Sequence, residues 1–207
     1  MPQSAQPIGR RERNKRDKLE RIIAAARELF DANGVDAVTT QQIADKADIG
    51  TGTLFLYAKS KSELLLLVQN SGYVAALEEG RAAAERTTGV VEAVLAIIRP
   101  VVECNRSHVE NGRTYLRELV FGDPEEPHHR EALMLTLKTE AAVAAVLCRD
   151  KRIGPDDAAT LAQIISAIMF LGMATTINAH RTVDEIIAEI AHRVRVMLPG
   201  EPDVLPT

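Results

Sequence analysis

The sequence is poor in aromatic residues: it has no Trp, three Tyr and four Phe among 207 residues. Because β-sheets favour aromatic and β-branched side chains, this scarcity argues against an all-β fold. Ala, Leu, Ile, Glu and Arg are abundant instead, and this bias favours helix. We therefore predict an all-α protein.

Three other features are missing, and each absence excludes a class of protein. The chain has only two cysteines, Cys104 and Cys148, which cannot form a disulfide framework or a four-cysteine zinc site. No run of apolar residues reaches about 18 before a polar residue interrupts it, which argues against a membrane span. The N-terminus is polar and then basic, without the apolar core of a signal peptide. We expect a cytoplasmic protein that does not associate with a membrane.

The motifs of common enzyme classes are also absent. The chain has no Gly-x-Ser-x-Gly nucleophile elbow, no phosphate-binding loop and no CxxC pair. Glu189 and His192 match the Glu-x-x-His spacing of di-iron bundles, but such a site needs the motif on two helices and two further carboxylates. Cys104 and His108 lie one helical turn apart, and two ligands are too few for a metal. We predict no catalytic activity, no metal and no cofactor.

Charge is distributed unevenly along the chain, whose net charge is −4. Residues 1–68 hold 11 of the 25 Lys and Arg and 9 of the 29 Asp and Glu, so they carry +2 and the rest carries −6. Six basic residues lie between Arg10 and Lys18, beside only Glu12 and Asp17. A solubilising tail has this composition, and so does a segment that binds a polyanion. If DNA is the partner, the N-terminal third binds it.

Hydrophobic periodicity and turn residues divide the chain into segments. Apolar residues at three- and four-residue steps predict a helix from about Lys15 to the Asn33–Gly34 stop. Further helices follow to about Leu198. The predicted organisation is a disordered basic arm at 1–14, a three-helix domain at 15–60, a larger helical domain at 61–198 and a disordered tail at 199–207.

Residues 39–57 predict two short helices joined by a three-residue turn that ends in Gly50. This is the spacing of a helix-turn-helix, whose second helix lies in the major groove of DNA. Thr39 and Gln42 form a capping box at the start of the first helix. The second helix begins with small and polar residues that let its backbone approach base edges, and flanking donors suit phosphates. These donors are Thr40, Tyr57, Lys59 and Lys61.

The stretch from Val38 to Leu64 resembles the DNA-binding domain of TetR-family transcriptional regulators, and Phe30–Gly34 resembles the end of that family's first helix. The resemblance covers about residues 17–67. Gly50 stands where a capping Ser is common, and Ala58 where an aromatic usually packs. The resemblance implies that the residues facing bases are Gln41, Thr51, Gly52 and Phe55. It implies that the phosphate contacts are Thr40, Thr53, Tyr57 and Lys61, together with Lys59. The basic arm would enter the minor groove.

In TetR-like proteins the C-terminal helices form a homodimer and enclose an inducer pocket, and the sequence offers candidates for both. The last two predicted helices, 156–179 and 183–198, are rich in apolar and small residues, so pairing them across a two-fold axis would make a four-helix bundle. The alternative is that both are core helices of a monomer. A mostly apolar ligand with one or two polar groups would contact Tyr73, His108, Tyr115, Phe121, Met134, Phe170 and Met173.

The resemblance therefore implies a ligand-responsive regulator, and a repressor rather than an activator. It would bind a palindromic, double-stranded operator as a dimer and leave it when a small-molecule inducer binds. Two alternatives stay open: a helical-bundle metalloenzyme that uses Glu189 and His192, and an adaptor that binds partner helices. Stoichiometric iron or manganese would indicate the first, and assembly beyond a dimer the second.

Overall fold

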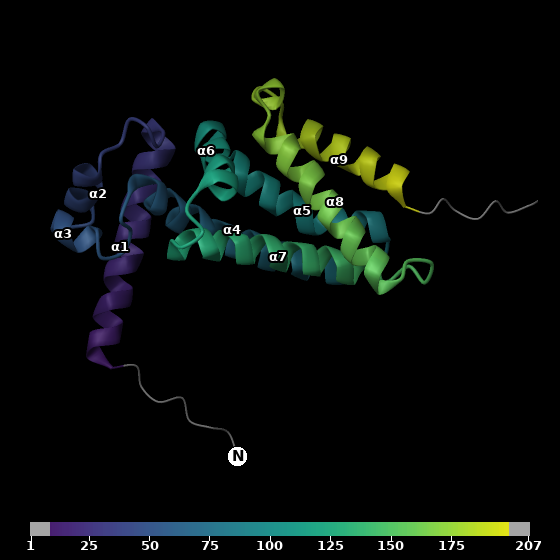
Figure 1. Ribbon diagram of the computed structural model, residues 1–207, viewed down its shortest axis with the longest axis horizontal. Coiled ribbons are helices and arrows are strands. Elements are labelled where there is room, and N and C mark those ends of the chain that lie inside the picture. Colours follow the sequence, from purple (N-terminus) through teal and green to yellow (C-terminus); the bar gives the residue numbers. More distant parts are fainter. Residues whose placement is uncertain (1–8, 199–207) are drawn as a thin grey trace, which may run out of the picture. The chain divides into compact units, whose positions relative to one another are not determined.

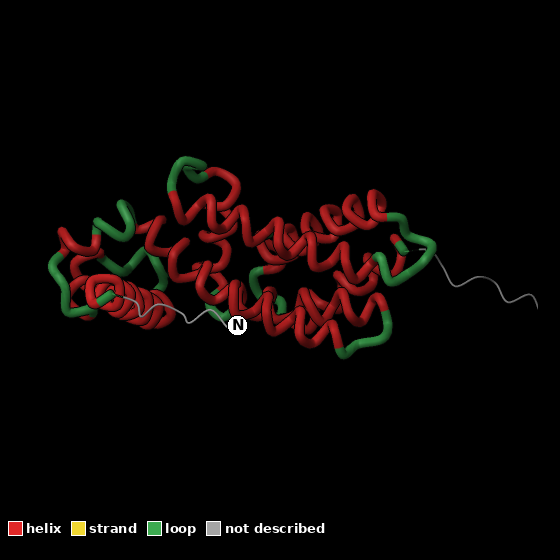
Figure 2. Tube along the Cα trace, turned by 90° about the horizontal axis from the view of Figure 1, so that it is seen from below, coloured by secondary structure: helices red, strands yellow, loops and turns green. Residues whose placement is uncertain are grey.

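The computed structural model describes residues 9–198, and its regular elements in that range are all helices (Figures 1 and 2). The prediction of an all-α fold is thereby confirmed. The chain divides into two compact units, one ending at Val68 and the other beginning at Gln69, and not at the predicted residue 60. The predicted tail at 199–207 and the first eight residues of the predicted arm lie outside the described residues.

The first unit contains α1 (Arg10–Asn33), α2 (Thr40–Lys46), α3 (Thr51–Leu54) and the start of α4 (Lys61–Glu85). Residues 10–14 are helical, whereas the sequence predicted a disordered arm there. The carbonyl oxygen of Gly9 accepts from the backbone N–H groups of Glu12 and Arg13, at 3.0 and 3.1 Å. Arg, Glu and Lys are strong helix formers, so once this turn is nucleated the helix continues into α1.

The core of the first unit is small and apolar. Ile22 and Phe30 of α1 pack there with Ile43 of α2, Leu54 of α3 and Leu64 of α4, all five being at most 1% exposed. Burying each such side chain contributes roughly 1.5–3 kcal/mol. Because α3 has only four residues, the burial of Leu54 is what holds this helix in place.

The ends of several helices are set by the residues that the sequence analysis identified. Gly34 ends α1 with a φ of 76°. The capping boxes at Thr39 and Thr182 are both complete. At the start of α4, the hydroxyl of Ser60 accepts from the backbone N–H of Glu63 at 3.1 Å. These contacts are local, which is why they could be predicted.

The second unit is a bundle of the rest of α4, α5 (Val90–Arg106), α6 (Val109–Phe121), α7 (Pro127–Leu147), α8 (Pro155–Ala174) and α9 (Val183–Met197). α7 and α8 pack along each other, and α5 lies against both α7 and α9 (Figure 1). α8 is shorter than predicted, because Thr175 is extended and a 3-10 turn follows at Thr176–Asn178.

Arg106 stabilises the connection between α8 and α9. Its side chain is buried, and Nη2 donates to the carbonyl oxygens of Asn178, Ala179 and Arg181 at 3.1, 3.0 and 2.7 Å. Burial lowers the pKa of this guanidinium from its ordinary value, with the nearby Arg113 contributing. A buried cation thus supplies the donors for three carbonyl oxygens of one irregular loop.

Candidate nucleic-acid interface and ligand cavity

The turn before α3 presents the start of this helix to solvent. Asp48 has a φ of 53°, in the left-handed region that Asp tolerates better than most residues. Gly50 then caps α3, because its carbonyl oxygen accepts from the backbone N–H of Thr53 at 2.8 Å. Gly52 is exposed, and a Cβ atom added to it would meet no atom within 4 Å. The first turn of α3 is therefore bare enough for close approach to another molecule.

Two of the residues predicted to face bases are joined by a hydrogen bond. The hydroxyl of Thr51 donates to Oε1 of Gln41 at 2.7 Å, and Nε2 of Gln41 donates to Oδ1 of Asp45 at 2.7 Å. Of the other two, Gly52 is exposed on the first turn of α3 and Phe55 is exposed beyond its end. Sequence reasoning missed Asp45, although its spacing of four residues from Gln41 on one helix was a usable signal. Asp45 orients the Gln41 amide toward α3.

The predicted phosphate contacts lie around the same helices. Nζ of Lys61 donates to the carbonyl oxygen of Asp36 at 3.0 Å, and the hydroxyl of Tyr57 donates to the carbonyl oxygen of Lys15 at 3.3 Å. Thr40 and Thr53 are half-buried, and Lys59 is exposed. These bonds fix the directions of the Lys61 and Tyr57 side chains on the surface of the first unit.

The basic residues near the N-terminus lie on α1 and not on an extended arm. Arg10, Arg11, Lys15 and Lys18 line an open hollow together with Tyr57. A helix with its side chains is about 10–12 Å across, whereas the minor groove of B-DNA is about 6 Å wide. The expected insertion into the minor groove therefore fails for residues 10–14, and contacts with phosphates are what this helix can make.

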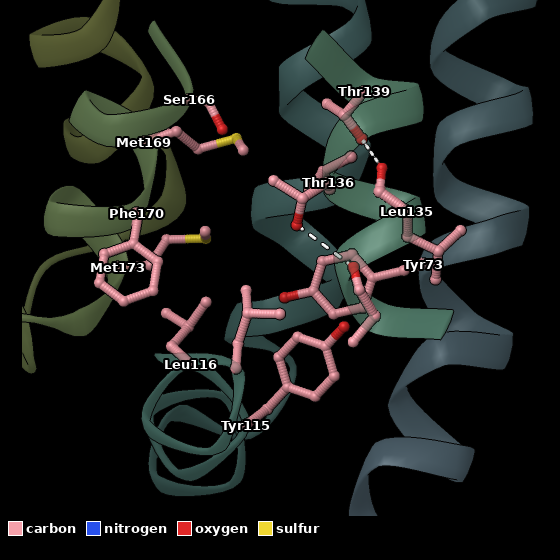
Figure 3. Close-up of a pocket in the computed structure, with 13 residues that line it drawn as sticks. Tyr73, Tyr115, Leu116, Leu135, Thr136, Thr139, Ser166, Met169, Phe170 and Met173 are labelled. Carbon is pink, nitrogen blue, oxygen red and sulfur yellow. Dashed lines mark hydrogen bonds between the residues drawn. The ribbon is translucent and has the colours of Figure 1, made fainter. Parts of the chain in front are cut away.

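The second unit contains a narrow cavity between α4, α5, α6, α7 and α8, with a volume of about 60 Å³ (Figure 3). Four of the predicted pocket residues line it: Tyr73, Tyr115, Phe170 and Met173. Cavities that hold drug-sized ligands measure roughly 300–1,000 Å³. A larger ligand must therefore displace side chains, and the flexible Met169 and Met173 are suited to that.

Three of the predicted pocket residues do not line this cavity. Nδ1 of His108 accepts from the backbone N–H of Asn111 and caps α6. Met134 is exposed on α7, where its neighbour Leu135 points inward. Phe121 is exposed and lines a separate groove with Arg113 and Arg117; Leu116 and Phe170 border both this groove and the cavity. Capping of α6 decided the outcome for His108, and the rotation of α6 and α7 about their axes decided it for Phe121 and Met134.

A polar network supports the two tyrosines of the cavity. Their rings stack with centroids 4.9 Å apart and an angle of 18° between the planes. The hydroxyl of Tyr115 donates to Oδ1 of Asn70 at 2.9 Å, and Nδ2 of Asn105 donates to the hydroxyl of Tyr73 at 2.7 Å. Burial raises the pKa of both tyrosines well above the usual value, so both stay protonated. Asn70 and Asn105 were not predicted from the sequence, because nothing in the neighbouring residues indicates that an Asn is buried.

Glu189, one of the two residues that motivated a metalloenzyme, has other partners. Glu189 forms ion pairs with Arg181 and Arg193. The hydrogen bond from Arg181, followed by the charges of both arginines, lowers the pKa of the Glu189 carboxyl. Between residues 9 and 198, no group of three or more His, Cys, Asp and Glu side chains is placed to hold a metal ion. Glu189 thus holds the α8–α9 connection to α9.

α8 is unusually apolar for a helix that is largely uncovered. Within the described chain it is the one helix long and apolar enough to cross a membrane, which the sequence analysis did not anticipate. Only 28% of its most apolar 18-residue window is buried. A helix of this composition also occurs in the core of soluble proteins and at interfaces between copies of a chain.

Comparisons with known proteins agree with this architecture. Residues 22–68 match the family model for bacterial regulatory proteins of the tetR family. No protein with a curated description matches the chain in sequence. The FadR repressor of Thermus thermophilus, a TetR-family protein in complex with lauroyl-CoA, has a similar structure with a TM-score of 0.69 at 21% identity. This similarity covers 91% of the present chain and 100% of the other.

Two further structures share the fold. FadR of Bacillus subtilis, in complex with stearoyl-CoA, aligns with a TM-score of 0.63 at 14% identity over 84% of the present chain and 96% of its own. A TetR-family regulator from Streptomyces coelicolor aligns with a TM-score of 0.61 at 20% identity, over 86% of the present chain and 93% of its own. Residues 22–68 thus match the DNA-binding domain of the tetR family, and the fold of the chain is similar to that of TetR-family transcriptional regulators.

Proposed function

We propose that this protein is a cytoplasmic, non-enzymatic repressor that binds a palindromic operator as a homodimer and leaves it when a small molecule occupies the second unit. The observation that carries the proposal is the bare first turn of α3, with Gly52 open to solvent, inside a domain that matches the family model. In such dimers the two reading helices contact half-sites about 34–36 Å apart.

In this proposal α3 lies in the major groove. Base contacts come from Gln41, Thr51, Gly52 and Phe55, and phosphate contacts from Thr40, Thr53, Tyr57, Lys59 and Lys61. The basic face of α1 adds further phosphate contacts. Thr51 and Gln41 already share a hydrogen bond, so they approach a base as one oriented unit.

The substitution Lys61→Ala tests one phosphate contact. We expect the variant to bind every duplex more weakly by a similar factor, because a phosphate contact carries no sequence information. The slope of log affinity against log salt should fall by about one, since one fewer counterion is released. Fluorescence anisotropy at four salt concentrations measures both effects. Lys151→Ala, an exposed lysine of the second unit, is the control, and an unchanged slope in the Lys61 variant would refute the contact.

The homodimer is proposed to form through α8 and α9. α8 exposes Ile164 and Leu171 on an apolar helix, and α9 exposes Val196. A second copy related by two-fold symmetry would cover these side chains and build a four-helix bundle. This contact would explain why so apolar a helix is left uncovered in one chain.

Leu171→Glu should break this dimer. Each copy of Leu171 loses roughly 1.5–3 kcal/mol of apolar burial, and a two-fold interface contains two copies, so the dimer should weaken about 100-fold or more. Analytical ultracentrifugation measures the dissociation constant. Leu137→Glu on α7 is a matched control, since Leu137 and Leu171 are 54% and 55% exposed. If Leu137→Glu dissociates the dimer and Leu171→Glu does not, the interface lies on α7.

The effector is proposed to be a long-chain acyl compound. The cavity is lined mainly by Leu, Met, Tyr and Phe side chains, and two proteins with this fold are complexed with lauroyl-CoA and stearoyl-CoA. Binding would shift the population toward conformations with lower affinity for the operator.

The proposed function is tested with the full chain and a palindromic duplex from the region upstream of its own gene. Anisotropy should show tighter binding to this duplex than to a random duplex of the same length, and addition of lauroyl-CoA should release the palindrome. Equal affinity for both duplexes would refute the proposal.

A further inference from the structure

The orientation of the Asn105 side chain determines what the Tyr73 hydroxyl can do. The amide nitrogen of Asn105 contacts two oxygen atoms, the hydroxyl of Tyr73 at 2.7 Å and the carbonyl oxygen of Gly112 at 3.2 Å. A carbonyl oxygen can only accept, so the nitrogen must face Gly112. The reverse orientation would place two acceptors against each other. The hydroxyl of Tyr73 is therefore the acceptor in its bond with Asn105.

The proton of the Tyr73 hydroxyl is consequently left without an acceptor among residues 9–198. Tyr73 is buried and lines the cavity, and Figure 3 shows its hydroxyl directed from α4 into that space. The stacked Tyr115 differs, because its hydroxyl already donates to Asn70. A buried donor without an acceptor is unfavourable, so this site is arranged to donate to whatever fills the cavity.

The rest of the lining restricts the chemistry of that occupant. Thr136 and Thr139 donate their hydroxyl protons to the carbonyl oxygens of Ala132 and Leu135 in their own helix. The only other hydroxyl in the lining is that of Ser166, across the cavity on α8, and none of the lining residues is charged (Figure 3). A carboxylate or phosphate here would be a buried charge without a partner. The buried part of the ligand is therefore neutral and apolar and carries an acceptor.

We propose that the Tyr73 hydroxyl donates a hydrogen bond to the carbonyl oxygen of an uncharged acyl group in this cavity, and that Tyr73 thereby selects acyl over alkyl ligands. The inference rests on the proposed function and deepens it, since it names the residue that recognises the effector and the group that is recognised. The acyl group would be linked as an ester or thioester, because a free carboxylate would bring its charge into the cavity.

The test compares lauroyl-CoA with S-dodecyl-CoA, a thioether that has the same chain length and lacks the carbonyl oxygen. Isothermal titration calorimetry is carried out on the full-length wild type, Tyr73→Phe and Tyr115→Phe. The wild type should bind lauroyl-CoA about tenfold more tightly than the thioether, which corresponds to about 1.4 kcal/mol. Tyr73→Phe should lose this preference by weakening lauroyl-CoA alone. Tyr115→Phe should keep it, since its hydroxyl bonds to Asn70.

Equal wild-type affinities for the two compounds would overturn the inference, and this result needs no variant. A preference that survives in Tyr73→Phe, or the binding of neither compound, would also overturn it. Operator binding by the same preparation distinguishes a failure of this inference from a failure of the proposed function. If one of these calorimetric results is obtained while the palindrome is bound specifically and lauroyl-CoA releases it, the proposed function stands and only the role of Tyr73 is refuted. If the duplexes are not distinguished, the proposed function itself fails.

Discussion

Gly52→Glu is expected to abolish specific operator binding and to leave the fold intact. The added carboxylate would extend from the first turn of α3, where a Cβ atom meets nothing within 4 Å, toward the base edges and phosphates of the groove. Charges of the same sign brought together cost several kcal/mol, so we expect at least about a 100-fold loss of affinity. Anisotropy at a fixed salt concentration measures it.

The matched control for Gly52→Glu is Gly52→Gln, which adds nearly the same volume without charge. Gln should reduce affinity less than Glu, because it obstructs the groove without repelling phosphates. Neither substitution should lower the free energy of unfolding, since Gly is about 1 kcal/mol less favourable than Ala inside a helix and Glu and Gln rank close to Ala. If the Glu variant binds the operator within threefold of the wild type, α3 does not lie in the groove.

Gly112→Ala should have the largest effect on stability. A Cβ atom at Gly112 would lie 2.1 Å from the carbonyl oxygen of Asn105 and 2.8 Å from its Oδ1 atom. The backbone of α5 cannot yield as a flexible side chain can, so α5 and α6 must move apart. Such overpacking costs about 1–3 kcal/mol, which would lower Tm by several degrees in a chain of this size.

Urea unfolding of Gly112→Ala measures this loss of stability. Gly52→Ala is the control, because it makes the same chemical change where no atom lies within 4 Å. We expect Gly52→Ala to be as stable as the wild type or more stable. Equal stability of the Gly112 variant and the wild type would show that α5 and α6 are not in close contact there. The Gly112 variant should also weaken ligand binding, since Asn105 positions the Tyr73 hydroxyl.

The DNA-binding segment was predictable because it is compact along the chain. Its capping box at Thr39, its turn before Gly50 and its buried Ile43 and Leu54 all lie within residues 39–57. Contacts over such short separations are visible as spacing in the sequence. The start of α1 at Arg10 was missed because a mainly basic segment suggested disorder, although its Arg and Glu residues favour helix.

The ligand cavity was only partly predictable. The sequence offered a few polar side chains among apolar ones as pocket residues, and Tyr73, Tyr115, Phe170 and Met173 line the cavity. His108, Phe121 and Met134 were chosen on the same grounds and do not line it. Residue type does not tell which side of a helix faces inward when neighbouring positions are both apolar, as Met134 and Leu135 are.

Local composition and spacing were enough to establish an all-helical chain, the turn that exposes α3 and the ends of several helices, because these depend on neighbours within a few residues. Packing between distant helices established the rest. Asn105 and Gly112, on two different helices, orient the hydroxyl of Tyr73 on a third. Which face of α8 stays uncovered depends on which face packs against the neighbouring helices. Helix rotation and long-range contacts depend on the whole unit folding together, and no short stretch of sequence contains them.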